Sequence, residues 1–317
     1  MRDLASRASL SGIAADAAQG LAERPRRLSP KWLYDAAGSA LFEQITRLPE
    51  YYPTRTETAI LRRHSDALAA LIPSGGALVE LGSGASAKTR ILLEAAPHLG
   101  AYVPIDISAD FLEETAQDLR RRFLALPVYP AVADFTRSVT LPGAVRALPK
   151  TAFFPGSTIG NLEPDVARDL LTDIRAWGDV RVLVLGADLV KDAATLVAAY
   201  DDSQGVTARF TTNALVRLAA EPGVRIDPDA FTYRASWNAG LARIDMELIA
   251  RKAHTARIEE AEFAFAADEP ILVSASRKYT PESHAALAEA GGWQLDMQYR
   301  DDNDLFAVAV LTPVDDG

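Results

Sequence analysis

Hydrophobic and polar positions in the middle of the chain follow two alternating patterns. Short apolar runs, such as ALVEL (77–81) and VRVLVLGADLV (180–190), have the length and composition of buried strands. Longer segments, such as AKTRILLEAAPHL (87–99) and PDVARDLLTDIRAW (164–177), repeat their apolar residues at helical spacing. Strands that alternate with helices form right-handed βαβ units. The pattern therefore predicts an α/β fold, with a mostly parallel sheet covered by helices on both faces.

The pattern changes after residue 190. Residues 231–258 and 260–267 alternate in the manner of antiparallel strands, before a helix at 281–292 and two last strands at 293–300 and 305–313. The first 55 residues do not follow the βαβ pattern either. We expect a sheet domain made of 56–190 and 279–317, and a second, discontinuous α+β domain made of 1–55 and 191–278.

The composition narrows the class of protein. The chain has 317 residues, of which 49% are hydrophobic, so it can bury the core of one large or two smaller domains. Its net charge of −10 argues against nucleic acid as a partner, since proteins that bind phosphate backbones concentrate lysine and arginine. Without cysteine, disulfides, thiolate metal sites and a cysteine nucleophile are excluded. The four histidines match no metal-ligand spacing, so we expect no metal.

Nothing in the sequence indicates a membrane or an export route. No apolar stretch is long enough to span a bilayer. The first 27 residues lack the apolar core of a secretory signal, and we interpret them as a short amphipathic helix followed by a basic linker. We expect a cytoplasmic protein that acts on a small molecule, without a membrane partner and as a monomer.

A glycine-rich loop, GSGASAKT (82–89), follows the first strand of the sheet. Gly82, Lys88 and Thr89 fit the P-loop pattern G-x-x-x-x-G-K-[ST], but Ala87 stands where the second glycine is required. The same alanine breaks the G-x-G-x-x-G pattern of NAD sites. A P-loop enzyme also needs an acid that binds magnesium, and VLVLGAD (182–188) is only a loose version of that strand. Both nucleotide interpretations stay open as the weaker alternatives.

S-adenosylmethionine fits the same loop better. Glu80 ends the first strand, Gly82 and Gly84 follow it, and Asp106 ends the second strand. An acid at the second position can accept both hydroxyls of a ribose, and glycines let the backbone approach a ligand closely. Since this ligand carries no phosphate, the glycine missing at position 87 is not needed.

Two further strand ends carry candidate ligand contacts. Asp134 and Phe135 follow the third strand, where an acid and a flat ring suit an adenine; a helix cap and a core phenylalanine would explain them about as well. Gly156 and Asn161 follow the fourth strand, beside the crevice in which α/β sheets bind ligands. An asparagine there can bind an amine or a carboxylate, although it would also be ordinary in a turn.

Several segments, taken in order from about residue 29, resemble the L-histidine Nα-methyltransferases of ergothioneine biosynthesis. They are SPKWLYDAAGSALFEQITRLPEYYPTRTE (29–57), LVELGSGASAKTR (78–90), GSTIGNLEP (156–164), DLVKD (188–192), AYDD (199–202) and RIDMEL (243–248). The resemblance implies a Rossmann-like S-adenosylmethionine methyltransferase sheet and a second domain that holds the amino-acid substrate. It also implies that the cofactor is contacted by Gly82, Lys88, Asp106, Asp134 and Phe135.

The resemblance implies substrate contacts as well. The amino and carboxylate ends would be held by Tyr34, Tyr51, Asn161 and Tyr200, of which Tyr34 and Asn161 are the candidate catalytic residues. Gly156, beside the crevice, is a further candidate for substrate binding. Met246 would line the ring pocket, and Ser276 would bind the imidazole. Without the resemblance, Tyr34, Tyr51 and Tyr52 would be interpreted as an aromatic core cluster.

One position departs from the family. Two residues before the serine, where the family has a glutamate that binds the imidazole, this chain has Ser274. A hydroxyl cannot replace the charge-assisted bond of a carboxylate, which contributes about 1.5–3 kcal/mol. Glu269 is the nearest carboxylate that could compensate. The sequence therefore leaves open whether histidine or another amino acid, such as tryptophan or tyrosine, is the preferred substrate.

The expected chemistry needs few groups. A sulfonium methyl group is already activated, so the enzyme has to align an unprotonated amine with it, and alignment can supply about 7–11 kcal/mol of a barrier. The amine has a reference pKa near ~8, so no strong base is required. Histidine conversion to its trimethyl betaine, hercynine, is the leading hypothesis. A non-catalytic sensor of S-adenosylmethionine or an amino acid is the alternative from another class.

Overall fold

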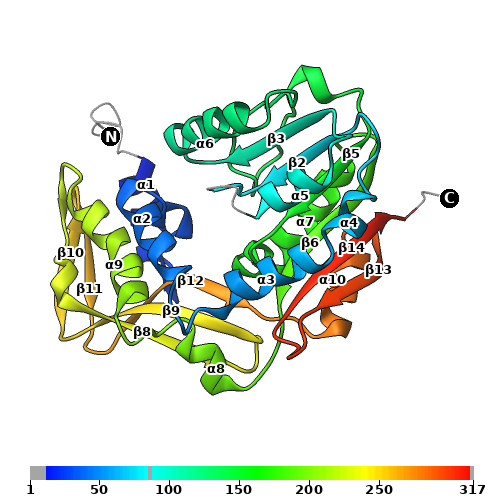
Figure 1. Cartoon of the computed structure of the whole chain (residues 1–317). Coiled ribbons are helices and arrows are strands. Elements are labelled where there is room, and N and C mark those ends of the chain that lie inside the picture. Colours follow the sequence, from blue (N-terminus) through cyan, green and yellow to red (C-terminus); the bar gives the residue numbers. More distant parts are fainter. Residues whose placement is uncertain (1–11, 85–87, 315–317) are drawn as a thin grey trace. The chain divides into compact units, whose positions relative to one another are not determined.

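The computed structural model describes residues 12–84 and 88–314 (Figure 1). The first eleven residues of the expected N-terminal segment, and Ala87 in the glycine-rich loop, lie outside this part of the chain. The chain divides into two compact units. Unit 1 comprises Met1–Tyr51 and Asp192–Ala275, and unit 2 comprises Tyr52–Lys191 and Ser276–Gly317. The boundary that the sequence suggested after residue 55 falls inside helix α3 (Tyr52–Arg63), which belongs to unit 2 as a whole.

Unit 2 contains one seven-stranded sheet with the strand order β13-β14-β6-β5-β2-β3-β4. The strands are β2 (Ala77–Leu81), β3 (Ala101–Asp106), β4 (Ala131–Val132), β5 (Lys150–Phe154), β6 (Val180–Asp188), β13 (Trp293–Arg300) and β14 (Phe306–Pro313). The strands from β4 to β6 pair in parallel, whereas β14 pairs antiparallel with both β6 and β13. The predicted α/β class, a Rossmann-like sheet together with a second domain, is confirmed.

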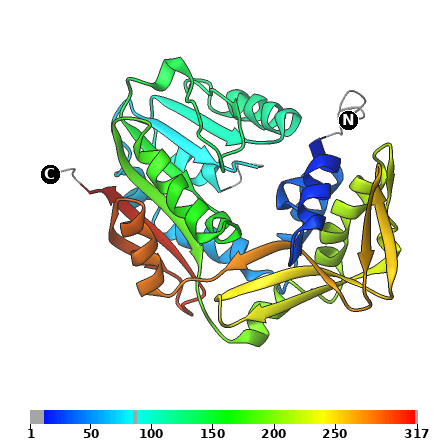
Figure 2. The same ribbon diagram turned by 180° about the vertical axis from the view of Figure 1, so that it is seen from behind.

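Alternating residues of each central strand pack on opposite faces of this sheet. Leu78, Tyr102 and Phe153 contribute to a core beneath α3, α4 (Ser65–Ala69), α5 (Thr89–Ala95) and α6 (Ala109–Arg122). Leu81 and Phe154 point to the other face, which is covered by α7 (Pro164–Arg175) and α10 (Pro281–Ala290) (Figure 2). This arrangement explains why the strands read as continuous apolar runs, because a sheet with two covered faces has no solvent side.

The strand order reverses at β2, whose neighbours β3 and β5 both follow it in sequence. Loops that leave the carboxyl ends of parallel strands meet at such a switch point, where open α/β sheets bind ligands. The glycine-rich loop, Asp106, the segment 156–161 and Asp188 all come directly after or at the carboxyl ends of these strands. The fold of unit 2 therefore gathers most of the candidate residues at one edge.

Unit 1 combines helices with two smaller sheets, of order β1-β12-β9-β8 and β11-β10-β7. Its strands are β1 (Arg26–Arg27), β7 (Val224–Arg225), β8 (Phe231–Asn238), β9 (Arg243–Ala250), β10 (His254–Ile258), β11 (Ala261–Phe265) and most of β12 (Pro270–Arg277). Its helices are α1 (Gly12–Ala22), α2 (Ala36–Ile45), α8 (Ala193–Ala198) and α9 (Val206–Ala219). Short 3-10 turns, η1 to η4, lie at Pro30–Leu33, Gly143–Val145, Thr158–Asn161 and Pro228–Ala230 in the two units.

Two elements differ from the pattern in the sequence. The expected third strand, near 128–135, is reduced to the two residues of β4, because Pro127 and Pro130 cannot donate to a ladder. Strand β12 was not expected, since PILVSASR carries serines at two positions that the structure buries. Within residues 12–84 and 88–314, no helix is long and apolar enough to cross a membrane.

Candidate functional site

The glycine-rich loop turns away from β2 through left-handed backbone. Gly82 has φ 66° and Gly84 has φ 47°, a region that residues with a Cβ rarely adopt. The amide groups of Gly82 and Ser83 donate to the carbonyl of Ile105 at 2.8 and 3.1 Å, which ties the loop to β3. A Cβ at Gly84 would meet no atom of residues 12–84 and 88–314 within 4 Å. This backbone can approach a ligand without a side chain in the way.

Asp106 ends β3 beside that loop. Its carboxylate accepts from the amide of Gly84 at 3.0 Å and from the amide of Ser108 at 3.1 Å. The side chain is only half-buried, and each carboxylate oxygen has a second lone-pair direction. Asp106 is thus fixed in orientation and still able to accept the two hydroxyls of a ribose.

Glu80 lies at the end of β2 and is buried, with 2% of its surface exposed. Its Oε2 accepts from the hydroxyl of Thr89 at 2.5 Å and from the hydroxyl of Tyr102. Burial raises the pKa of Glu80 to about 7, although both hydroxyl donors lower it. The carboxyl group therefore anchors the first turn of α5 to β3 beneath the loop.

This raised pKa predicts a pH-dependent contribution to stability. In the unfolded chain Glu80 loses its proton near the ordinary glutamate pKa of 4.5, whereas the folded chain keeps it to about pH 7. Stability from this group is therefore complete below pH 4.5 and declines as the pH rises to about 7. We expect Glu80→Gln to raise the thermal midpoint relative to the wild type increasingly between pH 5 and pH 7. Calorimetric scans across that range measure the gap, and a constant gap would refute the assignment.

Lys88, a predicted cofactor residue, pairs with Glu57 of α3. Glu57 is fully buried, and both of its carboxylate oxygens also accept from the amide of Gly156 at 2.9 Å. A P-loop lysine would direct its ammonium group to phosphates. In this chain the ammonium group instead links the glycine-rich loop to α3 and, through Glu57, to the loop after β5. This contact argues against the nucleotide alternatives.

Asp134 and Phe135 follow β4. Oδ1 of Asp134 accepts from the amide of Thr136 at 3.0 Å and from its hydroxyl at 2.5 Å, which closes a local turn. The ring of Phe135 packs edge-on against Phe154 at 5.4 Å and lies 3.5 Å from the Cβ position of Gly82. The helix-cap interpretation of Asp134 is therefore wrong, because a turn and not a helix follows it, whereas Phe135 is partly buried against the core and also borders the glycine-rich loop.

The segment after β5 forms the turn η3 and ends with Asn161. Asn161 is half-buried, and the amide group of Gly156 already donates to Glu57. Gly156 could therefore contact a substrate only through its carbonyl or its Cα. Ser157 adopts left-handed backbone with φ 56°, and its hydroxyl accepts from the amide of Asp188 at 2.9 Å.

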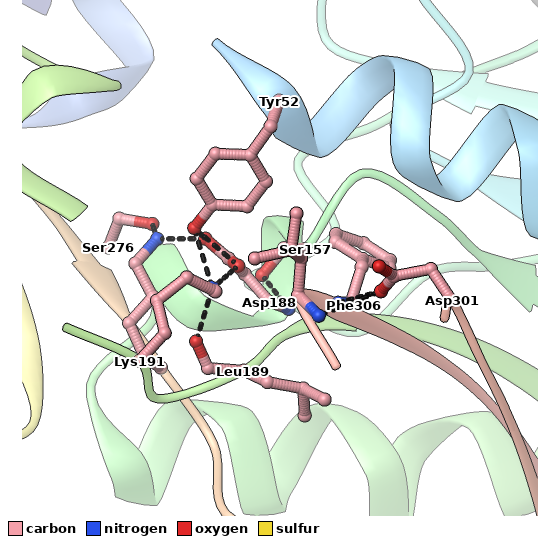
Figure 3. A network of polar contacts seen from close by, with 10 residues as sticks. Tyr52, Ser157, Asp188, Leu189, Lys191, Ser276, Asp301 and Phe306 are labelled. Atoms are coloured by element: carbon pink, nitrogen blue, oxygen red, sulfur yellow. Dashed lines mark hydrogen bonds and ion pairs between the residues drawn. The ribbon is translucent and has the colours of Figure 1, made fainter. Parts of the chain in front are cut away.

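A buried polar network surrounds Asp188 at the end of β6 (Figure 3). Its carboxylate accepts from the hydroxyl of Tyr52 at 2.8 Å and pairs with Lys191 at 2.6 Å and Lys278 at 2.7 Å. Lys278 also donates to the hydroxyl of Ser276 at 2.8 Å. Burial lowers the pKa of both lysines, and the carboxylate of Asp188 counteracts this. Asp188 is occupied by two ammonium groups, so it is not a magnesium ligand.

The predicted tyrosines belong to unit 1 and lie in one aromatic cluster. Tyr34 packs edge-on against Phe42 at 5.9 Å and Phe210 at 5.5 Å. Tyr51 packs edge-on against Tyr200 at 5.9 Å and against Phe42 at 6.5 Å. Tyr51 and Tyr200 are buried, whereas Tyr34 is half-buried. The core-cluster interpretation is therefore correct for the packing of Tyr34 and Tyr51, whereas Tyr52 donates its hydroxyl to the buried Asp188.

The remaining predicted residues of unit 1 are buried on its larger sheet. Met246 lies on β9 opposite Ala235, and Ser274 lies on β12. Glu269 does not replace the missing glutamate, because its carboxylate pairs with Arg26 at 2.7 Å and accepts from the amide of Ala266 at 2.9 Å. These contacts hold its pKa below the usual range.

Four residues around the switch point were not singled out from the sequence. They are Glu57, Asp188, Lys191 and Lys278. Asp188 could have been found, since it ends a strand as Glu80 and Asp106 do. Glu57 carries no such signal, because α3 brings it to the site only through tertiary packing. No group of three or more His, Cys, Asp or Glu residues suited to a metal ion occurs in the described part of the chain.

Comparison with known proteins gives this geometry its context. The profile of a family described as "histidine-specific methyltransferase, SAM-dependent" matches residues 13–313. The chain belongs to this family. It is 43% identical over 300 residues to the histidine N-alpha-methyltransferase of Mycolicibacterium smegmatis, covering 91% of each chain. The family description names S-adenosylmethionine as its methyl donor, so the predicted cofactor is confirmed.

More distant relatives widen the range of substrates. The chain is 35% identical over 202 residues to ergothioneine biosynthesis protein 1 of Neurospora crassa, which covers 60% of this chain and 22% of the relative. It is 28% identical over 261 residues to a 4-dimethylallyltryptophan N-methyltransferase of Claviceps purpurea, covering 74% of this chain and 75% of the relative. Relatives of the histidine-specific family thus include a protein named for an indole substrate.

Proposed function

We propose that this methyltransferase transfers methyl groups from S-adenosylmethionine to the α-amino group of free L-histidine and yields the trimethyl betaine hercynine for ergothioneine biosynthesis. The observation that carries the proposal is the 43% identity to a histidine N-alpha-methyltransferase over nine-tenths of both chains. The alternative of a non-catalytic sensor receives no support from this similarity. A cytoplasmic location and a monomeric state stay predictions from the sequence.

The residues at the switch point of unit 2 fit S-adenosylmethionine. The loop after β2 leaves the strand through the left-handed glycines Gly82 and Gly84, and the half-buried carboxylate of Asp106 can accept hydroxyl groups beside it. Phe135 offers a ring next to Gly82. We propose that Gly82 and Asp106 hold the methionine and ribose portions, that Asp134 and Phe135 hold the adenine, and that Lys88 acts on the loop through Glu57.

The chemistry asks little of the chain. The cofactor supplies a methyl group on a positively charged sulfur. As the bond between the amine nitrogen and this methyl group forms, the bond from the methyl group to sulfur breaks. The chain has to hold the amine with its lone pair unprotonated and aligned, after which each proton leaves for water. Neutral amide and phenol groups suit this task, because they orient the amine and tolerate the cationic product.

Each unit contributes residues to this proposal. In unit 2 we propose that the carboxamide of Asn161 orients the amine, that the Gly156 segment supports it, and that Ser276 binds the ring. In unit 1 we propose polar substrate contacts for Tyr34, Tyr51 and Tyr200, and apolar substrate contacts for Met246 on β9, beside the strand that carries Ser274. Of these, Tyr34 and Asn161 are the candidate catalytic residues.

A second substrate remains a specific candidate. Ser274 replaces the glutamate that the family places against the imidazole, and Glu269 is occupied by Arg26. A relative named for 4-dimethylallyltryptophan supports an indole amino acid as the alternative. Methylation of tryptophan or tyrosine is therefore the alternative to histidine.

A methyl-transfer screen over the twenty amino acids tests the proposal. We expect histidine to gain three methyl groups, read by mass, with a kcat/KM higher than that of any other amino acid. Asn161→Ala should raise the KM for histidine by up to about tenfold and leave the affinity for S-adenosylmethionine nearly unchanged, since a hydrogen bond to the neutral amine contributes about 0.5–1.5 kcal/mol. Binding of both ligands without any methylated product would instead support the sensor.

A further inference from the structure

Lys278 fixes the hydrogen-bonding direction of Ser276. The ammonium group of Lys278 is fully buried and lies 2.8 Å from Oγ of Ser276. An ammonium group has three donors and no acceptor, so in this contact the serine oxygen must accept. A hydroxyl that accepts from a cation becomes a stronger donor, because hydrogen bonds in a chain polarise one another.

The direction of this bond decides which rings Ser276 can recognise. A neutral imidazole has one nitrogen that accepts and one that donates, whereas an imidazolium ion has only donors. An indole also has only a donor, and a thiophene ring has no nitrogen at all. A serine that is held as a donor therefore favours a ring with an accepting nitrogen.

We propose that Lys278 is a positioning residue for substrate specificity: by holding Ser276 as a donor, it selects amino acids whose ring carries an accepting nitrogen, the neutral imidazole among them. This inference rests on the proposed function and on the assignment of Ser276 to the ring. It concerns the choice of ring, whereas the proposed function concerns the transfer of methyl groups to an amine.

The carboxylate of Asp188 stabilises the positive charge of Lys278 in its buried position. This carboxylate lies 2.7 Å from Lys278 and 2.6 Å from Lys191, while the hydroxyl of Tyr52 donates to it. Besides Asp188, Lys191 donates to the hydroxyl of Tyr52 at 2.6 Å and to the carbonyl of Leu189. The two lysines thus share one carboxylate, and Lys278 is the one that contacts Ser276.

The two lysines offer a matched pair of variants. Lys278→Met and Lys191→Met each leave Asp188 with one ammonium partner and remove the same charge. The test compares kcat/KM for histidine with kcat/KM for β-thienylalanine, whose five-membered ring is similar in size to imidazole but has no nitrogen. Lys278→Met should lower the ratio of histidine to β-thienylalanine at least about tenfold, the worth of one charge-assisted hydrogen bond. Lys191→Met should change that ratio less than about threefold, and both variants should keep their affinity for S-adenosylmethionine.

A double-mutant cycle separates this role from a merely structural one. In a Ser276→Ala background, Lys278→Met should not lower the ratio further, because its effect passes through the serine. An unchanged ratio in a folded Lys278→Met variant, or full additivity in the cycle, would overturn the proposal.

The wild type provides an independent measurement in case Lys278→Met does not fold. Protonation of the α-amine affects both substrates alike and cancels in the ratio of their kcat/KM values. The ratio of histidine to β-thienylalanine should therefore fall as the pH drops below the imidazole pKa of about 6.5. A ratio that stays flat, or rises, between pH 5.5 and pH 7.5 would contradict a donor at Ser276. If the wild type methylates β-thienylalanine but not histidine, the choice of histidine is wrong and this inference with it; if it methylates neither, the proposed function fails.

Discussion

Gly186→Ala should weaken both the stability of unit 2 and its affinity for S-adenosylmethionine. A Cβ at position 186 of β6 would lie 2.0 Å from Oε1 of the buried Glu57 and 3.3 Å from the amide of Gly156. The carboxylate would have to leave Lys88 and Gly156, which are its partners in the wild type. We expect a loss of about 3 kcal/mol, between the effects of overpacking a core and of breaking a buried ion pair.

Calorimetry measures both effects of this substitution. A loss of about 3 kcal/mol should lower the thermal midpoint by about 6–12 °C in a unit of this size. The affinity for S-adenosylmethionine should fall about tenfold or more, since Lys88 no longer ties the glycine-rich loop to α3. Gly143→Ala is the matched control, because a Cβ at that position would meet no atom of the described part of the chain within 4 Å. Equal effects of the two substitutions would show that Glu57 does not organise the loop.

The periodic part of the fold was accessible from the sequence. Apolar runs such as 77–81 and 180–188 became central strands because both faces of the sheet are covered, and the helices between them carry one apolar stripe. The acid at the end of each strand was also accessible, since strand ends fix where Glu80 and Asp106 must lie. In such cases a local pattern in the sequence carries the structural information.

Charged residues that the fold buries were not accessible in the same way. Lysines are almost always exposed, so Lys278 in SRKY reads as a surface residue, yet it is fully buried. Lys150 is buried as well, and nothing in the sequence around it indicates this. Its ammonium group donates to the carbonyls of Arg146, Leu148 and Gly178 at 2.8–2.9 Å. Such side chains are defined by partners far away in the sequence, and one sequence does not reveal them.

Unit 1 was harder to predict because the apolar and polar residues of a strand such as β12 do not show which face is buried. PILVSASR reads as neither a helix nor a continuous apolar run, although β12 buries Ser274 and Ser276 beside its apolar residues. The aromatic residues Tyr34, Tyr51 and Tyr200 are far apart in the sequence and share one cluster in the structure. Their proposed contacts with substrate depend on the family resemblance, and packing alone would not have suggested them.

Ser274→Glu should shift the enzyme towards histidine. Ser274 is 8% exposed, so a glutamate there has little water to solvate it and gains most from a ligand that donates a hydrogen bond. An imidazole N–H can provide that bond at a worth of about 1.5–3 kcal/mol, whereas a ring that leaves the carboxylate unpaired is penalised. The ratio of kcat/KM for histidine over tryptophan should therefore rise about 10–100-fold.

Ser274→Gln separates charge from size in this experiment. Glutamine fills the same space and can accept a hydrogen bond, but it carries no charge, so its ratio should rise much less than that of Ser274→Glu. A rise of the same size in both variants would mean that the pocket selects by volume, since a smaller cavity disfavours an indole without any carboxylate. A ratio that stays flat in both would show that position 274 does not contact the ring. Recognition of histidine would then depend on Ser276 as held by Lys278, because Glu269 already has its partner in Arg26.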